Sequence, residues 1–262
     1  MGYYSKLRIS WILVGIASLV VSIYGVFKPG IYADVVSSEI EPGVFAQDIL
    51  AVIAALVMVA LSLTVERGEV KKEVAILGIL GFFFYAYGLY VVEQVYTIVH
   101  PVYMAIFGAS SFSIAFTIAE ITGRESETVS LSGRLRFISL ALLVITPLIF
   151  IPLWFTRLVQ LIQTVDRIEY TFSVLILDLC FIMPGFVIVA YKSLKKDLSG
   201  ILLAPSLFIL GFFLLFPLAL AELIKPVLYD QQIEMGPLGL YLIFSLAYAA
   251  TTAVYLRQLK AG

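Results

Sequence analysis

The stretch VFAQDILAVIAALVMVALSLT, residues Val44–Thr64, decides the fold because it is apolar along nearly its whole length. A helix needs about 20 such residues to cross the hydrocarbon core of a bilayer. Lipid offers no partner to backbone amides and carbonyls, so a chain that crosses it must form a helix or a closed barrel. A run of this length predicts a transmembrane helix, with Asp48 as its only charged residue.

Other stretches of similar length and composition lie on both sides of this one. They are Ile9–Phe27, Val74–Gln94, Ile98–Glu120, Phe137–Gln160, Thr171–Tyr191, Ile201–Glu222 and Pro237–Leu256. The sequence therefore predicts an all-α fold, a polytopic transmembrane helix bundle with about eight spans. The first span lacks a clear cleavage site, and we interpret it as an uncleaved helix.

The composition agrees with a membrane protein and excludes several function classes. Hydrophobic residues make up 61% of the 262 residues and charged residues only 13%, with a mean hydropathy of +1.04. Soluble domains carry about 25% charged residues. The net charge of -1 argues against nucleic-acid binding, which needs a clustered basic face. Cys180 is the only cysteine, which excludes an internal disulfide, and His100 is the only histidine, which excludes a bis-histidine haem.

Basic residues in the connecting segments predict the orientation, because they are enriched on the cytoplasmic side. Of the 17 basic residues, 13 fall on one side of the predicted spans. These are Lys6, Arg8, Arg67, Lys71, Lys72, Arg124, Arg134, Arg136, Lys192, Lys195, Lys196, Arg257 and Lys260. The other side holds Lys28, Arg157, Arg167 and Lys225. We expect a multi-pass protein of the cell membrane with both termini in the cytoplasm.

A shift of 130 residues brings two halves of the chain into register. Asp48 then falls on Asp178, and Ile79–Phe83 falls on Ile209–Phe213, which has the same five residues. This predicts a parallel four-plus-four internal repeat, a type of symmetry common in transporters. The predicted parts are a first half over residues 1–122, a cytoplasmic linker over 123–136 and a second half over 137–262. The alternative interpretation is that two apolar stretches of sequence match here by chance.

Ionisable groups at membrane depth are the candidate binding residues, because a charge there is costly unless it is paired or hydrated. Asp178 lies about seven residues into its span, roughly 10 Å along the helix axis. Asp48 occupies the matching but shallower place in the first half. The other candidates for binding a substrate or ion at this outer level are Glu93, Glu222, His100, Arg157, Tyr85 and Tyr90. We expect them to line one polar cavity, open to the outside, between the two halves.

Each candidate also has a purely structural interpretation. Asp48 suits the first turn of a helix, where the macrodipole favours an acidic group. Asp178 could form a structural ion pair with Arg157 or Arg167. Glu222 with Lys225, and Glu120 with Arg124, have the spacing of ordinary helical pairs. The tyrosines are typical of an interfacial aromatic belt, and His100 before Pro101 is typical of a helix start.

Three function classes remain open. The first is a transporter or carrier for an unknown small solute, proton or cation. The second is a non-catalytic subunit or assembly factor, docking on membrane partner subunits through the small residues of Gly108–Ser111 and Ala247–Thr252. The third is an enzyme that acts on a lipid-like substrate through carboxylates. No phosphate-binding loop or H-E-x-x-H motif occurs, so the sequence predicts no cofactor and no metal site.

Overall fold

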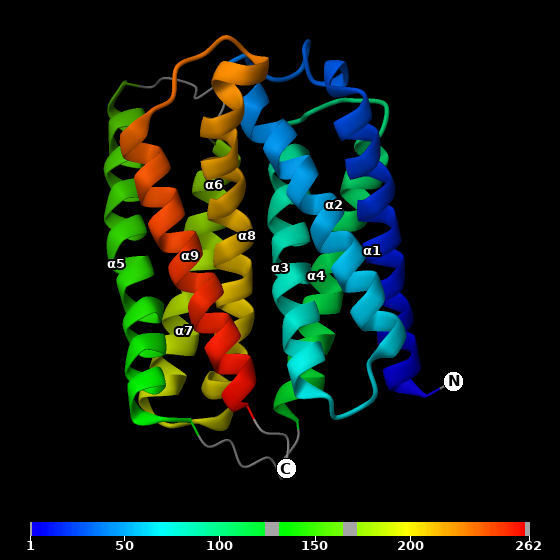
Figure 1. The fold of residues 1–262 in the computed structure, drawn as a ribbon, viewed down its shortest axis with the longest axis vertical. Coiled ribbons are helices and arrows are strands. Elements are labelled where there is room, and N and C mark those ends of the chain that lie inside the picture. The colour runs from blue at the N-terminus through cyan, green and yellow to red at the C-terminus, as the bar shows by residue number, and fades with distance from the viewer. Residues whose placement is uncertain (1, 124–130, 165–171, 260–262) are drawn as a thin grey trace.

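The computed structural model describes residues 2–123, 131–164 and 172–259, and these form helices joined by short connections (Figure 1). In the first half lie α1 (Tyr3–Phe27), the 3-10 turn η1 (Pro29–Ile31), α2 (Glu41–Thr64), α3 (Val70–Val92) and α4 (His100–Thr122). In the second half lie α5 (Gly133–Thr164), α6 (Phe172–Leu177), the π-helical η2 (Asp178–Ile182), α7 (Met183–Leu194), α8 (Leu198–Leu228) and α9 (Met235–Gln258). No β-strand occurs among the described residues.

The predicted fold class is confirmed. Within the described ranges, eight helical segments are long and apolar enough to cross a membrane, and each matches one predicted span. The sixth span is continuous through α6, η2 and α7. Most helices begin several residues before the predicted apolar run. At α1 and α3 these extra turns carry Lys6, Arg8 and Lys71, since a helix can continue into the interface where charged side chains reach water.

The π-helical segment in the sixth span is a feature that the sequence did not predict. The Met183 N–H donates to the Asp178 carbonyl oxygen, five residues back instead of four. Pro184 follows and has no N–H to offer to the preceding turn. The wider turn therefore begins at Asp178 itself, the most deeply placed acidic residue of the second half. Segments of this kind are frequent at functional sites.

The first-half helices pack together on one side of the molecule and the second-half helices on the other (Figure 1). In the first half α1 packs on α2 and α3 on α4; in the second half α5 packs on α7 and α8 on α9. The two halves meet chiefly where α3 lies against α8. This order of pairing is the one that a parallel repeat requires, but the repeat itself stays a prediction from the sequence.

The α3–α8 contact includes the very segments that the sequence repeat brought into register. Phe82 stacks on Phe213 with ring centroids 5.1 Å apart. Gly78 allows the two backbones to approach, because a Cβ there would lie 2.6 Å from the Ile209 Cβ and 2.8 Å from the Ser206 carbonyl oxygen. Phe82 and Phe213 belong to the hydrophobic core, and Gly78 is buried as well. Close helix packing through small residues is a main source of stability in membranes, where lipid is as apolar as leucine.

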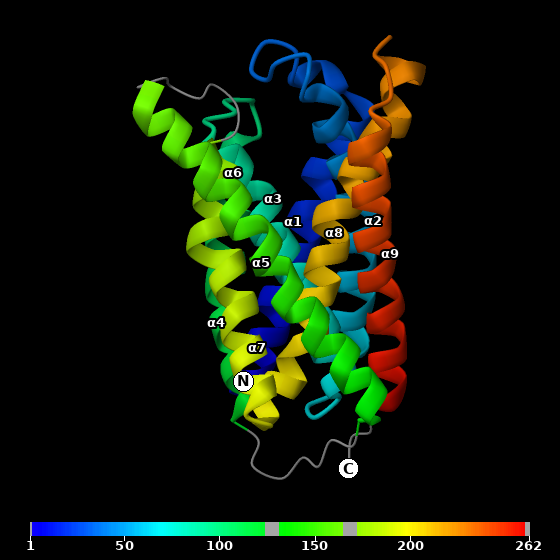
Figure 2. The same cartoon turned by 90° about the vertical axis from the view of Figure 1, so that its left-hand side faces the viewer.

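The described chain begins and ends at the same end of the bundle (Figure 1), as an even number of spans requires. Figure 2 shows α5 crossing the neighbouring helices obliquely at one face of the bundle. Residues 124–130 of the predicted linker, and Arg124, Arg167, Thr171 and Lys260 of the sequence argument, lie outside the described residues. That the shared end of the termini faces the cytoplasm stays a prediction.

Gly78→Ala should destabilise the protein by about 1–3 kcal/mol, because the added methyl group overpacks the contact between the halves. The measurement is the thermal unfolding midpoint of the purified protein in detergent. Gly108→Ala in α4 is the matched control, since a Cβ there meets nothing within 4 Å. Equal midpoints for the two variants would show that α3 and α8 are not tightly packed at Gly78.

Candidate functional site

Asp48 forms the centre of a buried polar group inside the first half. It lies in the second turn of α2, and only 2% of its surface is exposed. The Tyr32 hydroxyl donates to Asp48 Oδ2 over 2.8 Å and lies 3.1 Å from the Tyr103 hydroxyl. Tyr32 comes from the connection between α1 and α2, where η1 turns the chain inward. A residue of a loop therefore supplies the hydrogen bond to the buried carboxyl.

Aromatic rings from α3 and α4 enclose this group. Tyr87 and Tyr90 are three residues apart and so share one face of α3. The Tyr90 ring lies 5.9 Å from Tyr32 and 4.9 Å from Tyr103, and Tyr87 stacks on Tyr103 at 5.6 Å. The Tyr87 hydroxyl bonds to the Ser22 hydroxyl over 2.8 Å. The Tyr90 hydroxyl completes no hydrogen bond with another described residue.

The space for the carboxyl is made by a glycine on α1. A Cβ added at Gly25 would lie 1.9 Å from Asp48 Oδ2 and 2.9 Å from the Tyr32 hydroxyl. No side chain other than hydrogen fits there while Asp48 keeps its position. Gly25 therefore belongs to the site, although nothing in its sequence context marked it.

The described groups that contact the Asp48 carboxyl are neutral hydrogen-bond donors and aromatic rings, with no positive charge among them. Among the described residues, no lysine, arginine or histidine forms an ion pair with Asp48. Burial, together with the nearby Tyr90 and Asp48, raises the pKa of Tyr32 far above its ordinary value. Tyr32 therefore stays protonated and remains a hydrogen-bond donor. An ionised carboxylate in such a setting lacks a full countercharge, so binding of a proton or a cation would stabilise it.

Asp178 lies in a second, separate group. It is 6% exposed, and the Tyr85 hydroxyl from α3 and the Trp154 indole N–H from α5 both approach its carboxyl. The Trp154 Nε1 is buried and completes no hydrogen bond with the described residues. The predicted ion pair with Arg157 is absent among the described residues, since Arg157 is exposed and unpaired with Asp178. Arg167 lies outside them.

The remaining sequence candidates take structural positions. Glu93 ends α3, and its Oε1 accepts from the Ser173 N–H over 2.7 Å, which joins α3 to the start of α6. Glu222 pairs with Lys225 over 2.6 Å and accepts from the Glu234 N–H over 2.9 Å, so the interpretation as a helical ion pair is confirmed.

His100 begins α4, as its helix-start interpretation predicted. Its Nδ1 lies 2.8 Å from the Val95 carbonyl oxygen. The imidazole contacts the rings of Tyr96 and Tyr103, with centroids 4.9 Å and 6.3 Å away. His100 therefore borders the Asp48 group through Tyr103 without bonding to the carboxyl.

The structure does not bring the predicted acidic residues into one group. Asp48 contacts the tyrosines of the first half, Asp178 faces Tyr85 and Trp154, and Glu222 is paired with Lys225 on its own helix, α8. Tyr85 and Tyr87 lie about 200° apart around α3, at about 100° per residue. Helix α3 therefore stands between the two aspartates. The expected shared cavity is replaced by two polar groups on opposite faces of this helix.

Comparison with known protein families, characterised proteins and solved structures gives no match for this chain. The functional interpretation therefore stands on the geometry of the two groups alone.

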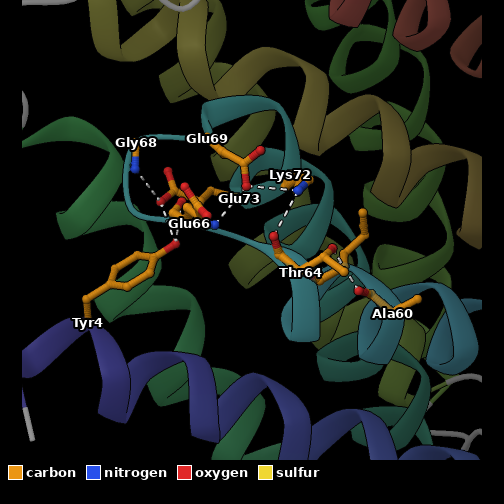
Figure 3. Close-up of polar contacts among 9 residues, drawn as sticks. Tyr4, Ala60, Thr64, Glu66, Gly68, Glu69, Lys72 and Glu73 are labelled. Carbon is orange, nitrogen blue, oxygen red and sulfur yellow. Dashed lines mark hydrogen bonds and ion pairs between the residues drawn. The ribbon is translucent and has the colours of Figure 1, made fainter.

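A further buried acid, Glu73, was missed by the sequence analysis. Its side chain is fully buried near the start of α3, and Oε1 accepts from the Tyr4 hydroxyl over 3.0 Å (Figure 3). Beside it, Lys72 bonds to Glu69 over 2.9 Å and to the Thr64 carbonyl oxygen. Arg67 pairs with Glu120 over 2.8 Å, while the predicted partner Arg124 lies outside the described residues. This network fixes the turn between α2 and α3.

Gly68→Ala should destabilise this turn by about 1–3 kcal/mol, because its φ of +100° is strained for a residue with a Cβ. Thermal unfolding in detergent measures the effect. Gly30→Ala is the control, since a Cβ fits in open space at both positions and only Gly68 has a positive φ. Equal stability of Gly68→Ala and Gly30→Ala would contradict the positive φ of Gly68 in the turn shown in Figure 3.

Tyr32→Phe should destabilise the protein by about 1–3 kcal/mol, because it leaves the buried Asp48 carboxyl without its hydrogen-bond donor. The comparison is with Tyr96→Phe, which removes a tyrosine hydroxyl from a side chain that is 66% exposed at the same end of the bundle. Both variants keep the aromatic ring. If Tyr32→Phe unfolds at the same temperature as Tyr96→Phe, the Tyr32–Asp48 bond does not contribute to stability.

Proposed function

We propose that this multispan membrane protein is a proton- or cation-linked carrier with one acidic site in each half. The observation that carries the proposal is the pair of buried carboxyls, Asp48 and Asp178, that lack a basic partner among the described residues. Acidic residues inside transmembrane segments commonly mark ion and proton pathways. The two-site arrangement takes the place of the single shared cavity expected from the sequence.

The contrast with the other acids supports a binding role for these two. Glu222 has Lys225 at 2.6 Å, and Glu120 has Arg67 at 2.8 Å, so each has a basic partner and no need of a bound ion. Asp48 and Asp178 instead face hydroxyl and indole groups, which remain neutral. Neutral donors can hold a carboxyl in place whether it carries a proton or a bound cation. Such a site suits repeated uptake and release better than a permanent ion pair does.

The Asp48 site also has one polar group free to bind a ligand. The Tyr90 hydroxyl is buried and forms no hydrogen bond by distance and angle with another described residue. A buried polar group without a partner costs about 1–3 kcal/mol. Binding of a hydrated proton or a cation with its water would satisfy the Tyr90 oxygen, which can both donate and accept.

Exchange with the outside requires movement, because both carboxyls are enclosed. Tyr32 covers Asp48 and is itself only 2% exposed, so displacement of the α1–α2 connection would open the first site. In the second half, the site lies on the π-helical turn that begins at Asp178, a kind of irregular turn that is frequent at functional sites. The proposal takes the described conformation as an occluded state.

The acid–base dyad of the enzyme hypothesis receives no support from these contacts. Asp48 and Asp178 share no neighbour at hydrogen-bonding distance among the described residues, and α3 lies between them. A general acid and base pair must reach one substrate, each within about 3 Å of the atom to or from which it transfers a proton.

Flux measurements in liposomes test the carrier proposal. The protein would be reconstituted with a pH-sensitive dye inside, and proton movement followed under imposed pH, Na⁺ and K⁺ gradients. We expect flux above that of empty liposomes, and a loss of about tenfold or more in Asp48→Asn and in Asp178→Asn. Asp34→Asn is the matched control, since Asp34 is exposed in the α1–α2 connection.

Three results would contradict the proposal. They are wild-type flux no greater than in empty liposomes under all three gradients, unchanged flux in both buried variants, and equal loss in Asp34→Asn. Thermal unfolding of each variant in detergent separates loss of function from loss of folding.

A further inference from the structure

A hollow of about 390 Å³ lies on the exposed face of α7, near the C-terminal end of this helix and the turn into α8. It is lined by Val187, Ile188, Tyr191, Lys192, Lys195 and Asp197. Its lining begins nine residues after Asp178, about 14 Å along the helix axis, at the opposite end of the sixth span from α6. The carrier proposal makes no use of it.

The lining residues form a polarity gradient along one face of α7. Val187, Tyr191 and Lys195 are four residues apart, as are Ile188 and Lys192, so both sets follow the same helical face. From Val187 to Lys195 the face rises about 12 Å. Val187, Ile188 and Tyr191 are 47%, 56% and 60% exposed. The order along the axis is aliphatic, then aromatic, then cationic, which complements the acyl chain, the glycerol region and the phosphate of a phospholipid in that order.

The charged end of the hollow is held in place by the protein. Lys192 Nζ donates to the Ser199 hydroxyl over 2.8 Å and pairs with Asp197 over 3.4 Å. Lys195 Nζ lies 5.6 Å from the centre of the Tyr191 ring. The lining thus carries two lysines and one carboxylate, and this carboxylate is already engaged by Lys192 and Ser199. Lys195 is left as the cation without an acidic partner in the lining.

We propose that this hollow binds one anionic phospholipid, with its phosphate at Lys192 and Lys195, its glycerol region at Tyr191 and an acyl chain along Val187 and Ile188. The excess of positive charge favours an anionic headgroup over a zwitterionic one, because a choline or ethanolamine group would bring a further cation beside the two lysines. Basic pockets at the membrane interface are typical sites for acidic lipids. Tyrosine is likewise enriched at headgroup level.

Native mass spectrometry of the detergent-purified protein tests this site. The probes are dioleoyl phosphatidylglycerol and dioleoyl phosphatidylcholine, titrated separately. We expect tighter binding of phosphatidylglycerol, and a loss of about fivefold in its affinity in Lys195→Gln, the effect of about one interfacial lysine. Lys71→Gln is the matched control, because Lys71 is an exposed lysine at the same end of the bundle on α3. It should leave the affinity unchanged.

A second variant separates a seated lipid from general attraction to basic surface. Val187→Trp keeps every lysine but fills the apolar part of the hollow, and it should also weaken phosphatidylglycerol binding. Soluble glycerol 3-phosphate, added at the same concentration as the lipid, should not displace it. The proposal is overturned by equal binding of the two lipids, by equal affinity in Lys195→Gln and Lys71→Gln, by undiminished binding in Val187→Trp, or by displacement with glycerol 3-phosphate.

Discussion

The hydrocarbon core supplies no hydrogen bonds, so every backbone polar group that crosses it must find a partner within the protein. The backbone meets this requirement by forming helices throughout the eight spans. Several polar side chains also find partners on other helices. Tyr87 bonds to Ser22, Trp11 donates to Thr117 over 2.9 Å, and the Tyr255 hydroxyl donates to the Ile201 carbonyl oxygen over 2.7 Å. Each of these bonds joins two helices, so the same requirement also orders the bundle.

Helix α3 contacts both halves of the bundle and both buried aspartate groups. It packs on α4 within the first half and on α8 across the halves, and most of its residues are buried. One face carries Tyr87 and Tyr90 toward the Asp48 group, and another carries Tyr85 toward Asp178. At one end Glu73 binds Tyr4, and at the other Glu93 caps the start of α6. A single helix thus sets the positions of both acidic sites and of the contact between the halves.

The spans could be predicted from sequence because their signal is local, a run of about 20 apolar residues with few charges. The partner of Asp48 could not, because Tyr32 lies in a polar connection whose path depends on tertiary packing. Some information in the sequence was available but unused. The five-residue spacing of Tyr85 and Tyr90 places them about 140° apart on a helix, which argues against one common cavity. Glu73 follows Val70 by three residues and precedes Leu77 by four, so it shares their buried face.

The α1–α2 connection also contacts the far half of the molecule. The Gln231 amide, in the link from α8 to α9, donates to the Ser38 carbonyl oxygen over 2.9 Å. The same short segment thus holds Tyr32 inside the first bundle and is tied to the second one. It links the two halves at the end of the bundle opposite the termini (Figure 1). A tilt of α8 and α9 would pull on this segment at Ser38, six residues from the Tyr32 that covers Asp48, so that a movement of one half would be transmitted to the buried carboxyl of the other.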